Sequence, residues 1–102
     1  MLIGEVIGTV VATQKSEGLD GLKLLIVEQL GPDASRTGKH IVAVDSVGAG
    51  QGDVVLYVIG SSARTIESTS ERPVDALIMG IIDSLDVLNE RKYEKWSSDG
   101  HQ

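Results

Sequence analysis

The chain has 102 residues, of which 41% are hydrophobic and 24% charged, so one domain with a single core is expected. Its net charge is −6, which argues against nucleic acid or an anionic membrane surface as the main partner, since both require a basic surface. It has no cysteine, which excludes disulfides, a thiolate nucleophile and cysteine-based metal sites.

Five apolar runs rich in valine and isoleucine predict five strands along the chain. Turn-forming residues separate them, as in the segment 31–38, and Ser61 and Ser62 favour a short helical turn after Gly60. The expected strands are residues 2–13, 22–29, 39–45, 53–59 and 74–82. Short strands with turns between them indicate an all-β fold, a small closed barrel.

Several expected strands are apolar on both faces. Residues 54–59 are six consecutive apolar residues, and residues 76–82 contain a single interruption, Gly80. A small barrel normally carries polar residues where its outer face meets water, so we expect a neighbouring subunit to cover this one. In the first strand, Gly4 and Gly8 are four residues apart, which predicts that they share one face, at a bend or a close backbone approach.

A glycine-rich loop follows the third expected strand, with Gly48, Gly50 and Gly52 inside five residues. Dinucleotide-binding loops also follow a strand, but a helix comes after them, whereas another strand is expected here, so no helix N-terminus would face a phosphate. The phosphate-binding pattern G-x-x-x-x-G-K-[ST] is absent. We interpret the loop, with Ala49, as a tight connection that packs closely against another copy of the chain.

The segment Gly60–Arg64 superficially resembles the turn that carries a catalytic serine. Arg64 stands where the pattern G-x-S-x-G requires glycine, and the two histidines, His40 and His101, lie at a strand start and in the tail. A helix cap, followed by an arginine that pairs with a carboxylate, explains the segment better than a catalytic serine does. The chain is therefore not expected to be an enzyme.

The sequence has no cluster of His, Asp or Glu residues with the spacing that a metal site requires. Asp83 and Asp86 are three residues apart after a strand, which would place them on opposite faces. Neither a metal nor a cofactor is expected. Arg72 and Asp75 are instead candidates for a structural ion pair.

The remaining alternative from the residues is a nucleic-acid-binding barrel. Such barrels use exposed aromatic and basic residues, and here Tyr57 is the only aromatic residue before the charged segment 89–102. We expect residues 1–88 to form the barrel domain and 89–102 a charged tail. Tyr93 and Trp96 are three apart, so one face of a helix would place them together on a surface.

Six short motifs in order resemble those of one family, the pentameric vertex proteins of bacterial microcompartment shells, of the EutN/CcmL type. The resemblance covers residues 1–88. The motifs are Gly8–Lys15, Gly21–Leu25, Ala43–Gly50, Gly60–Arg64, Arg72–Ala76 and Ile81–Asp83.

The resemblance implies an OB-like β-barrel, a cyclic pentamer without catalytic activity, and a place at the corners of a polyhedral shell in the bacterial cytoplasm. The partners it implies are the hexameric and pseudohexameric proteins of the same shell, with neither nucleic acid nor membrane. It leaves open whether the shell is a carboxysome or a catabolic microcompartment. Residues at subunit contacts or near the central axis would be Gly48, Ala49, Gly50, Gly52, Gly60, Ser61, Ser62 and Arg64.

Overall fold

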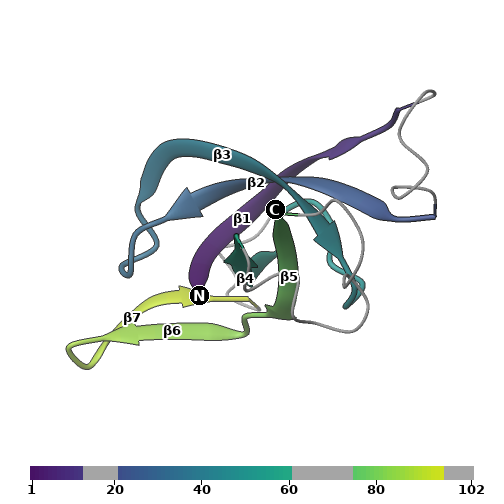
Figure 1. Ribbon diagram of the computed structural model, residues 1–102. Coiled ribbons are helices and arrows are strands. Elements are labelled where there is room, and N and C mark those ends of the chain that lie inside the picture. The colour runs from purple at the N-terminus through teal and green to yellow at the C-terminus, as the bar shows by residue number, and fades with distance from the viewer. Residues whose placement is uncertain (13–20, 61–74, 96–102) are drawn as a thin grey trace.

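The computed structural model describes residues 1–12, 21–60 and 75–95, and five of its strands close into a barrel (Figure 1). The barrel strands are β1 (Leu2–Val10), β2 (Lys23–Leu30), β3 (Arg36–Asp45), β4 (Val54–Ile59) and β5 (Ala76–Ile81). The predicted all-β, five-stranded barrel is therefore confirmed. No helix occurs within the described ranges, and the helical turn expected after Gly60 lies outside them.

The barrel closes in the order β1-β2-β3-β5-β4, with β4 returning to β1. All neighbours are antiparallel except β3 and β5, which pair in parallel at Val44 with Leu77 and at Asp45 with Ile78. β3 and β4 therefore run in opposite directions, and the glycine loop (residues 46–53) connects them at one end of the barrel.

Aliphatic side chains fill the barrel, as the scarcity of aromatic residues requires. Tyr57 is the largest fully buried side chain of the described residues, with 2% of its surface exposed. The principal core cluster is Val6, Leu25, Val27, Ala43, Ala49, Val55, Tyr57, Ala76 and Ile78. A second, smaller cluster joins Val44 and Leu77 to the half-buried Leu22, Leu24 and Val58. The apolar residues on both faces of β4 and β5 thus belong to two different clusters.

Gly4 and Gly8 do not share a face, contrary to the prediction from their spacing. The pairing of β1 with β2 shifts between Val6 and Gly8, so Gly8 lies opposite Ile26. This bulge inserts a residue and reverses the alternation of side chains. Gly4 points into the barrel, where a Cβ atom would collide with Val27 and would lie 2.9 Å from the carbonyl oxygen of Glu28.

The strand β3 begins at Arg36, inside the segment 31–38 that was expected to be entirely turn. Arg36 reaches from β3 across the barrel surface and donates to Glu28 at 2.6 Å and to Glu5 at 2.9 Å. The hydroxyl of Thr37 donates to the carbonyl oxygen of Gln29 at 2.7 Å. These side-chain contacts extend the strand through residues whose local preferences favour a turn.

A β-hairpin follows the barrel, built by β6 (Ser84–Val87) and β7 (Glu90–Glu94). We call residues 84–94 the C-terminal arm; Figure 1 shows it projecting from the lower edge of the barrel. Tyr93 lies in β7, so the expectation of a helical face there is wrong for Tyr93, and Trp96 lies outside the described residues. The hairpin spans the domain boundary expected after residue 88, and that boundary stays a prediction.

Candidate functional site

The glycine loop is held by a buried carboxylate at its start. Asp45, whose side chain is 2% exposed, accepts hydrogen bonds from the backbone N–H groups of Val47 at 3.2 Å, Gly48 at 3.1 Å and Ala49 at 3.1 Å. Lys23 Nζ lies 3.3 Å from the same carboxylate and donates to the carbonyl oxygen of Ala49 at 2.7 Å. The first half of the loop therefore has a fixed shape within the subunit.

The second half of the loop is fixed by Asp53 and β1. Asp53 accepts the N–H of Gly50 at 2.9 Å, and the N–H of Gly52 donates to the carbonyl oxygen of Val6 at 2.8 Å. The amide donors of these glycines, like that of Gly48, are thus engaged within the chain. A phosphate-binding loop needs such donors directed at the ligand. The loop does not have the arrangement of a nucleotide site.

The glycines of the loop differ in why the subunit needs them. Gly48 and Gly52 have φ angles of +84° and +94°, a region that favours glycine. Gly50 has no such angle, and a Cβ atom there would meet nothing within 4 Å. Ala49 is fully buried in the barrel core. Nothing inside the subunit therefore requires glycine at position 50.

The second predicted segment, which starts at Gly60, lies at the opposite end of β4 from the glycine loop. The six residues of β4 separate the two segments by about 20 Å. The N–H of Gly60 donates to the carbonyl oxygen of Asp75 at 2.8 Å, which closes the start of β5 against the end of β4.

Of the other residues predicted in this region, the structure describes only Asp75. Ser61, Ser62, Arg64 and Arg72 lie outside the described residues, whereas Asp75 is described and exposed. The Arg72–Asp75 ion pair and the contact roles of residues 61–64 stay predictions.

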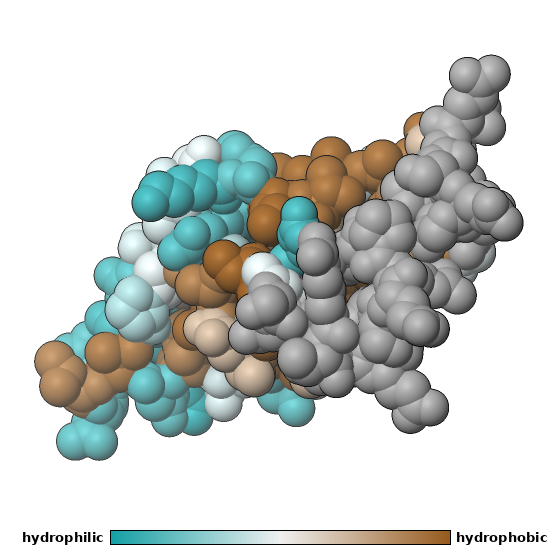
Figure 2. Space-filling view, viewed as in Figure 1, coloured by the Kyte–Doolittle hydropathy of each residue, from teal (hydrophilic) through white to brown (hydrophobic). Residues whose placement is uncertain are grey.

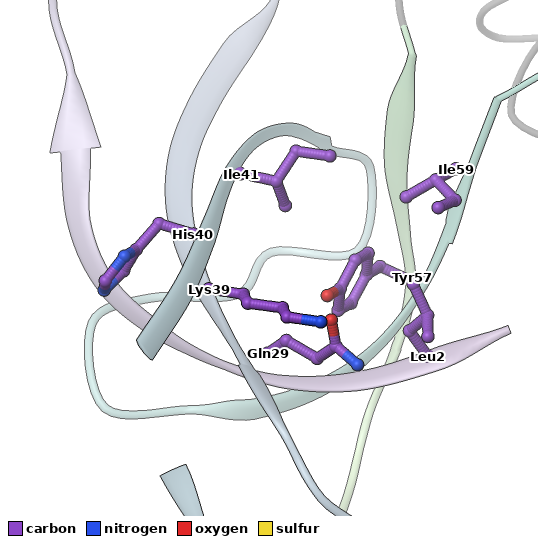
Figure 3. Close-up of a pocket in the computed structure, with 7 residues that line it drawn as sticks. All are labelled: Leu2, Gln29, Lys39, His40, Ile41, Tyr57 and Ile59. Atoms are coloured by element: carbon purple, nitrogen blue, oxygen red, sulfur yellow. The ribbon is translucent and has the colours of Figure 1, made fainter. Parts of the chain in front are cut away.

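A pocket of about 120 Å³ lies at the Gly60 end of the barrel (Figure 3). Figure 3 shows the side chains of Gln29, Lys39 and Tyr57 pointing toward one another, whereas His40 turns away. Burial raises the pKa of the Tyr57 phenol above its ordinary value of 10.0. The lining residues are Leu2, Gln29, Lys39, His40, Ile41, Tyr57 and Ile59. The sequence does not reveal this pocket, because four strands contribute to it.

A charged cluster on the outside of the barrel was also missed. Glu5 and Glu28 lie directly opposite each other on β1 and β2, an arrangement of like charges that is unfavourable unless a cation joins them. Arg36 supplies that cation; its hydrogen bond to Glu28 lowers the pKa of this carboxyl below its usual value of 4.5. The N–H of Gly38 donates to Glu28 at 3.1 Å and adds to this lowering. The arrangement ties three strands together and stabilises the fold.

The described part of the chain gives little support for metal binding or for a membrane-spanning helix. Within residues 1–12, 21–60 and 75–95 there is no group of three or more His, Asp or Glu side chains placed to hold a metal ion. Asp86 pairs with Arg91, which gives this carboxylate a structural partner. No helix in these ranges is long and apolar enough to cross a membrane.

Comparison with known proteins identifies relatives along nearly the whole chain. The family model described as "Ethanolamine utilisation protein EutN/carboxysome" matches residues 1–83. The shell vertex protein GrpN of Rhodospirillum rubrum is 44% identical over 89 residues, which cover 87% of this chain and all of GrpN. The carboxysome shell vertex protein CcmL of Gloeobacter violaceus is 41% identical over 95 residues, 93% of this chain and 95% of CcmL.

Solved structures agree with the sequence comparison. The structure of Gloeobacter violaceus CcmL, 40% identical, has a TM-score of 0.89 over 95% of this chain and all of that one. The pentameric microcompartment shell protein GrpN from Rhodospirillum rubrum, 44% identical, has a TM-score of 0.79 over 86% of this chain and all of GrpN. The sequence and the fold together show that this chain belongs to the EutN/CcmL family of bacterial microcompartment shell vertex proteins.

Proposed function

We propose that this protein is a structural component of a bacterial microcompartment, a ring of five subunits that closes the vertices of a polyhedral shell in the cytoplasm. One observation carries the proposal: the chain matches shell vertex proteins over nearly their entire length, including one solved as a pentamer. We further propose that the protein has no catalytic activity, since its relatives are named for their place in the shell.

Exposed apolar side chains support an assembly of several subunits. Figure 2 shows apolar surface over the middle of the molecule and at the outer end of the C-terminal arm. Among the residues that the structure describes, the exposed large apolar ones are Met1, Val11, Val42, Val47, Ile59, Met79 and Leu88. Contiguous apolar surface on a soluble protein commonly marks a contact with another protein. Neighbouring subunits of a ring would remove part of this surface from water.

A closed ring is also physically reasonable for this chain. A head-to-tail contact joins two different patches of the same subunit, and it gives a ring when the rotation between neighbours closes. Five copies with a charge of −6 give 5 × −6 = −30, which favours a soluble free ring.

We propose as partners the hexameric and pseudohexameric proteins that form the facets of the same shell. Relatives of this chain are named as vertex proteins of carboxysomes and of other microcompartments. No specific observation favours the alternative of a nucleic-acid-binding barrel.

Co-expression with the facet proteins of one microcompartment tests the proposed function. With this protein present, electron microscopy should show closed polyhedra that retain the protein after purification; without it, the shells should have open corners. Closed shells that form equally well without the protein, and that do not contain it when it is present, would contradict the proposal. Oligonucleotide binding that weakens with added salt would instead favour the nucleic-acid alternative.

A further inference from the structure

The outer end of the C-terminal arm presents an apolar side chain in an unusual backbone conformation. Leu88 and Asn89 form the turn between β6 and β7, with φ angles of +52° and +67°. Positive φ at both positions is typical of the tight hairpin turn that favours asparagine and glycine, and leucine is unfavourable there. Leu88 is nevertheless 91% exposed, so the subunit itself gains no burial from it.

The charged side chains of the arm largely neutralise one another. Arg91 pairs with both Asp86 and Glu94, and Lys92 Nζ lies 3.1 Å from Glu90. A two-stranded hairpin alone is only marginally stable in water. An arm with its ion pairs already formed and an apolar residue at its tip is suited to contact another protein surface.

The pocket at the Gly60 end of the barrel has a size that suits such a tip. Its volume of about 120 Å³ is of the order of the ~150 Å³ cavity that removal of one buried leucine side chain leaves in a protein core. Leu2, Ile41 and Ile59 supply apolar lining, and Ile59 is 46% exposed. An apolar side chain from another subunit can therefore enter the pocket and contact these residues.

The charges around the tip and the pocket are complementary. Lys39 contributes a cation to the lining of the pocket. Glu90, two residues after Leu88, pairs with Lys92 within the arm, but its side chain is 72% exposed, so its carboxylate can also face a second cation. An arm tip that places Leu88 against the apolar lining brings this carboxylate toward the basic side of the pocket. Opposite charges of this kind fix the orientation of a contact.

We propose that the arm tip of one subunit occupies this pocket of the next subunit, with Leu88 inserted and Glu90 facing Lys39. This inference rests on the proposed ring and specifies one of its contacts. The subunit's own pocket is not filled by its own tip, because Leu88 is almost fully exposed in the single chain. A tip and a pocket at different places on one subunit make a head-to-tail contact, which is the kind that generates rings.

Cysteine cross-linking tests the contact without background, because the natural chain contains no cysteine. The double variant Leu88→Cys with Ile59→Cys should, on oxidation, give a ladder of covalently linked chains that extends to five. The matched control is Leu88→Cys with Val11→Cys, since Val11 is 89% exposed but follows β1 at the end away from Leu2, which lines the pocket. The control pair should give no ladder beyond linked pairs.

Native mass spectrometry of the reduced variants separates the two proposals. Rings of five chains without a ladder, or equal ladders from both pairs, overturn the tip-in-pocket contact and leave the proposed function standing. Absence of rings in the natural protein overturns both. If Ile59→Cys prevents assembly, Leu88→Cys with Gln29→Cys provides a second pair on the same pocket, and it should also give the ladder.

Discussion

At the scale of single residues, Gly4 is a position where the barrel has no room for a side chain. An added Cβ atom would collide with Val27 and lie 2.8 Å from the ring of Tyr57. We expect Gly4→Ala to lower the free energy of unfolding by about 1–3 kcal/mol, the cost typical of overpacking a core.

Gly8→Ala is the matched control on the same strand, because a Cβ atom at Gly8 would only make an ordinary contact with Ile26 at 3.5 Å. Urea unfolding at one fixed protein concentration measures both variants. Equal effects of the two substitutions would contradict the close packing described around Gly4.

Asp45 determines the shape of the glycine loop through its buried carboxylate. Asp45→Ala would leave the N–H group of the buried Ala49 without its acceptor, so we expect a loss of about 1–3 kcal/mol in the free energy of unfolding. Asp33→Ala is the control, since Asp33 is exposed and accepts the N–H of Ser35 at 3.1 Å. Thermal unfolding should show a clearly smaller change for Asp33→Ala; the reverse order would be inconsistent with a loop built on Asp45.

The ion cluster of Glu28 and Arg36 predicts a pH dependence of stability. The hydrogen bond from Arg36 lowers the pKa of Glu28 in the folded chain below the usual value of 4.5. A group with a lowered folded pKa contributes stability above its unfolded pKa and loses it as the pH falls through the folded value. The stability difference between the natural protein and Glu28→Gln should therefore be constant near pH 7 and shrink below about pH 4.5.

Urea midpoints of both proteins between pH 7 and pH 3 measure this difference. A stability difference that stays constant down to pH 3 would contradict the claim that the hydrogen bond from Arg36 lowers the pKa of Glu28 in the folded chain.

At the scale of structural elements, the five barrel strands were predictable because each is a dense run of β-branched or other apolar residues. The same reasoning failed where contacts distant in sequence decide the structure. The bulge beside Gly8 is visible only in the pairing of β1 with β2, and β3 begins at Arg36 because two glutamates on other strands hold its side chain.

The C-terminal arm was missed for a related reason. Its turn is Leu88–Asn89, which lacks the glycine that normally indicates a tight hairpin turn. Charged residues dominate the segment from Asn89 onward, and they concealed the alternation that pairs Leu85 with Tyr93. The candidate site was predictable in part: the sequence identified the glycine loop, whereas the pocket required the closed barrel to be known.

Gly50 offers a test of the glycine loop as a subunit contact. A Cβ atom at Gly50 would meet no atom of its own subunit within 4 Å, and the position has no positive φ angle, so the barrel of Gly50→Val should fold with little loss of stability. If the loop packs closely against a neighbouring subunit, the same variant should lower the fraction of assembled rings. Gly48→Val is the contrasting variant, because φ is +84° there and the subunit itself should be strained.

Circular dichroism and size-exclusion chromatography together report on these loop variants. Normal folding with an unchanged assembly for Gly50→Val would count against a role of the loop in subunit packing.

At the scale of the whole molecule, the features described here favour a subunit made for assembly. The barrel is closed, yet Val42 and Ile59 remain 48% and 46% exposed, and the arm projects with Leu88 at its tip. Each of these features places apolar surface where a neighbour can cover it. The family relationship accounts for the barrel, and the exposed surface supports several subunits acting together.

Native mass spectrometry of the purified protein tests the central claim most directly. The account predicts a ring of five 10.8 kDa chains, with a mass of 5 × 10.8 = 54 kDa. A single species of 10.8 kDa at micromolar concentration would contradict it, since the exposed apolar surface and the arm would then have no partner among copies of the chain.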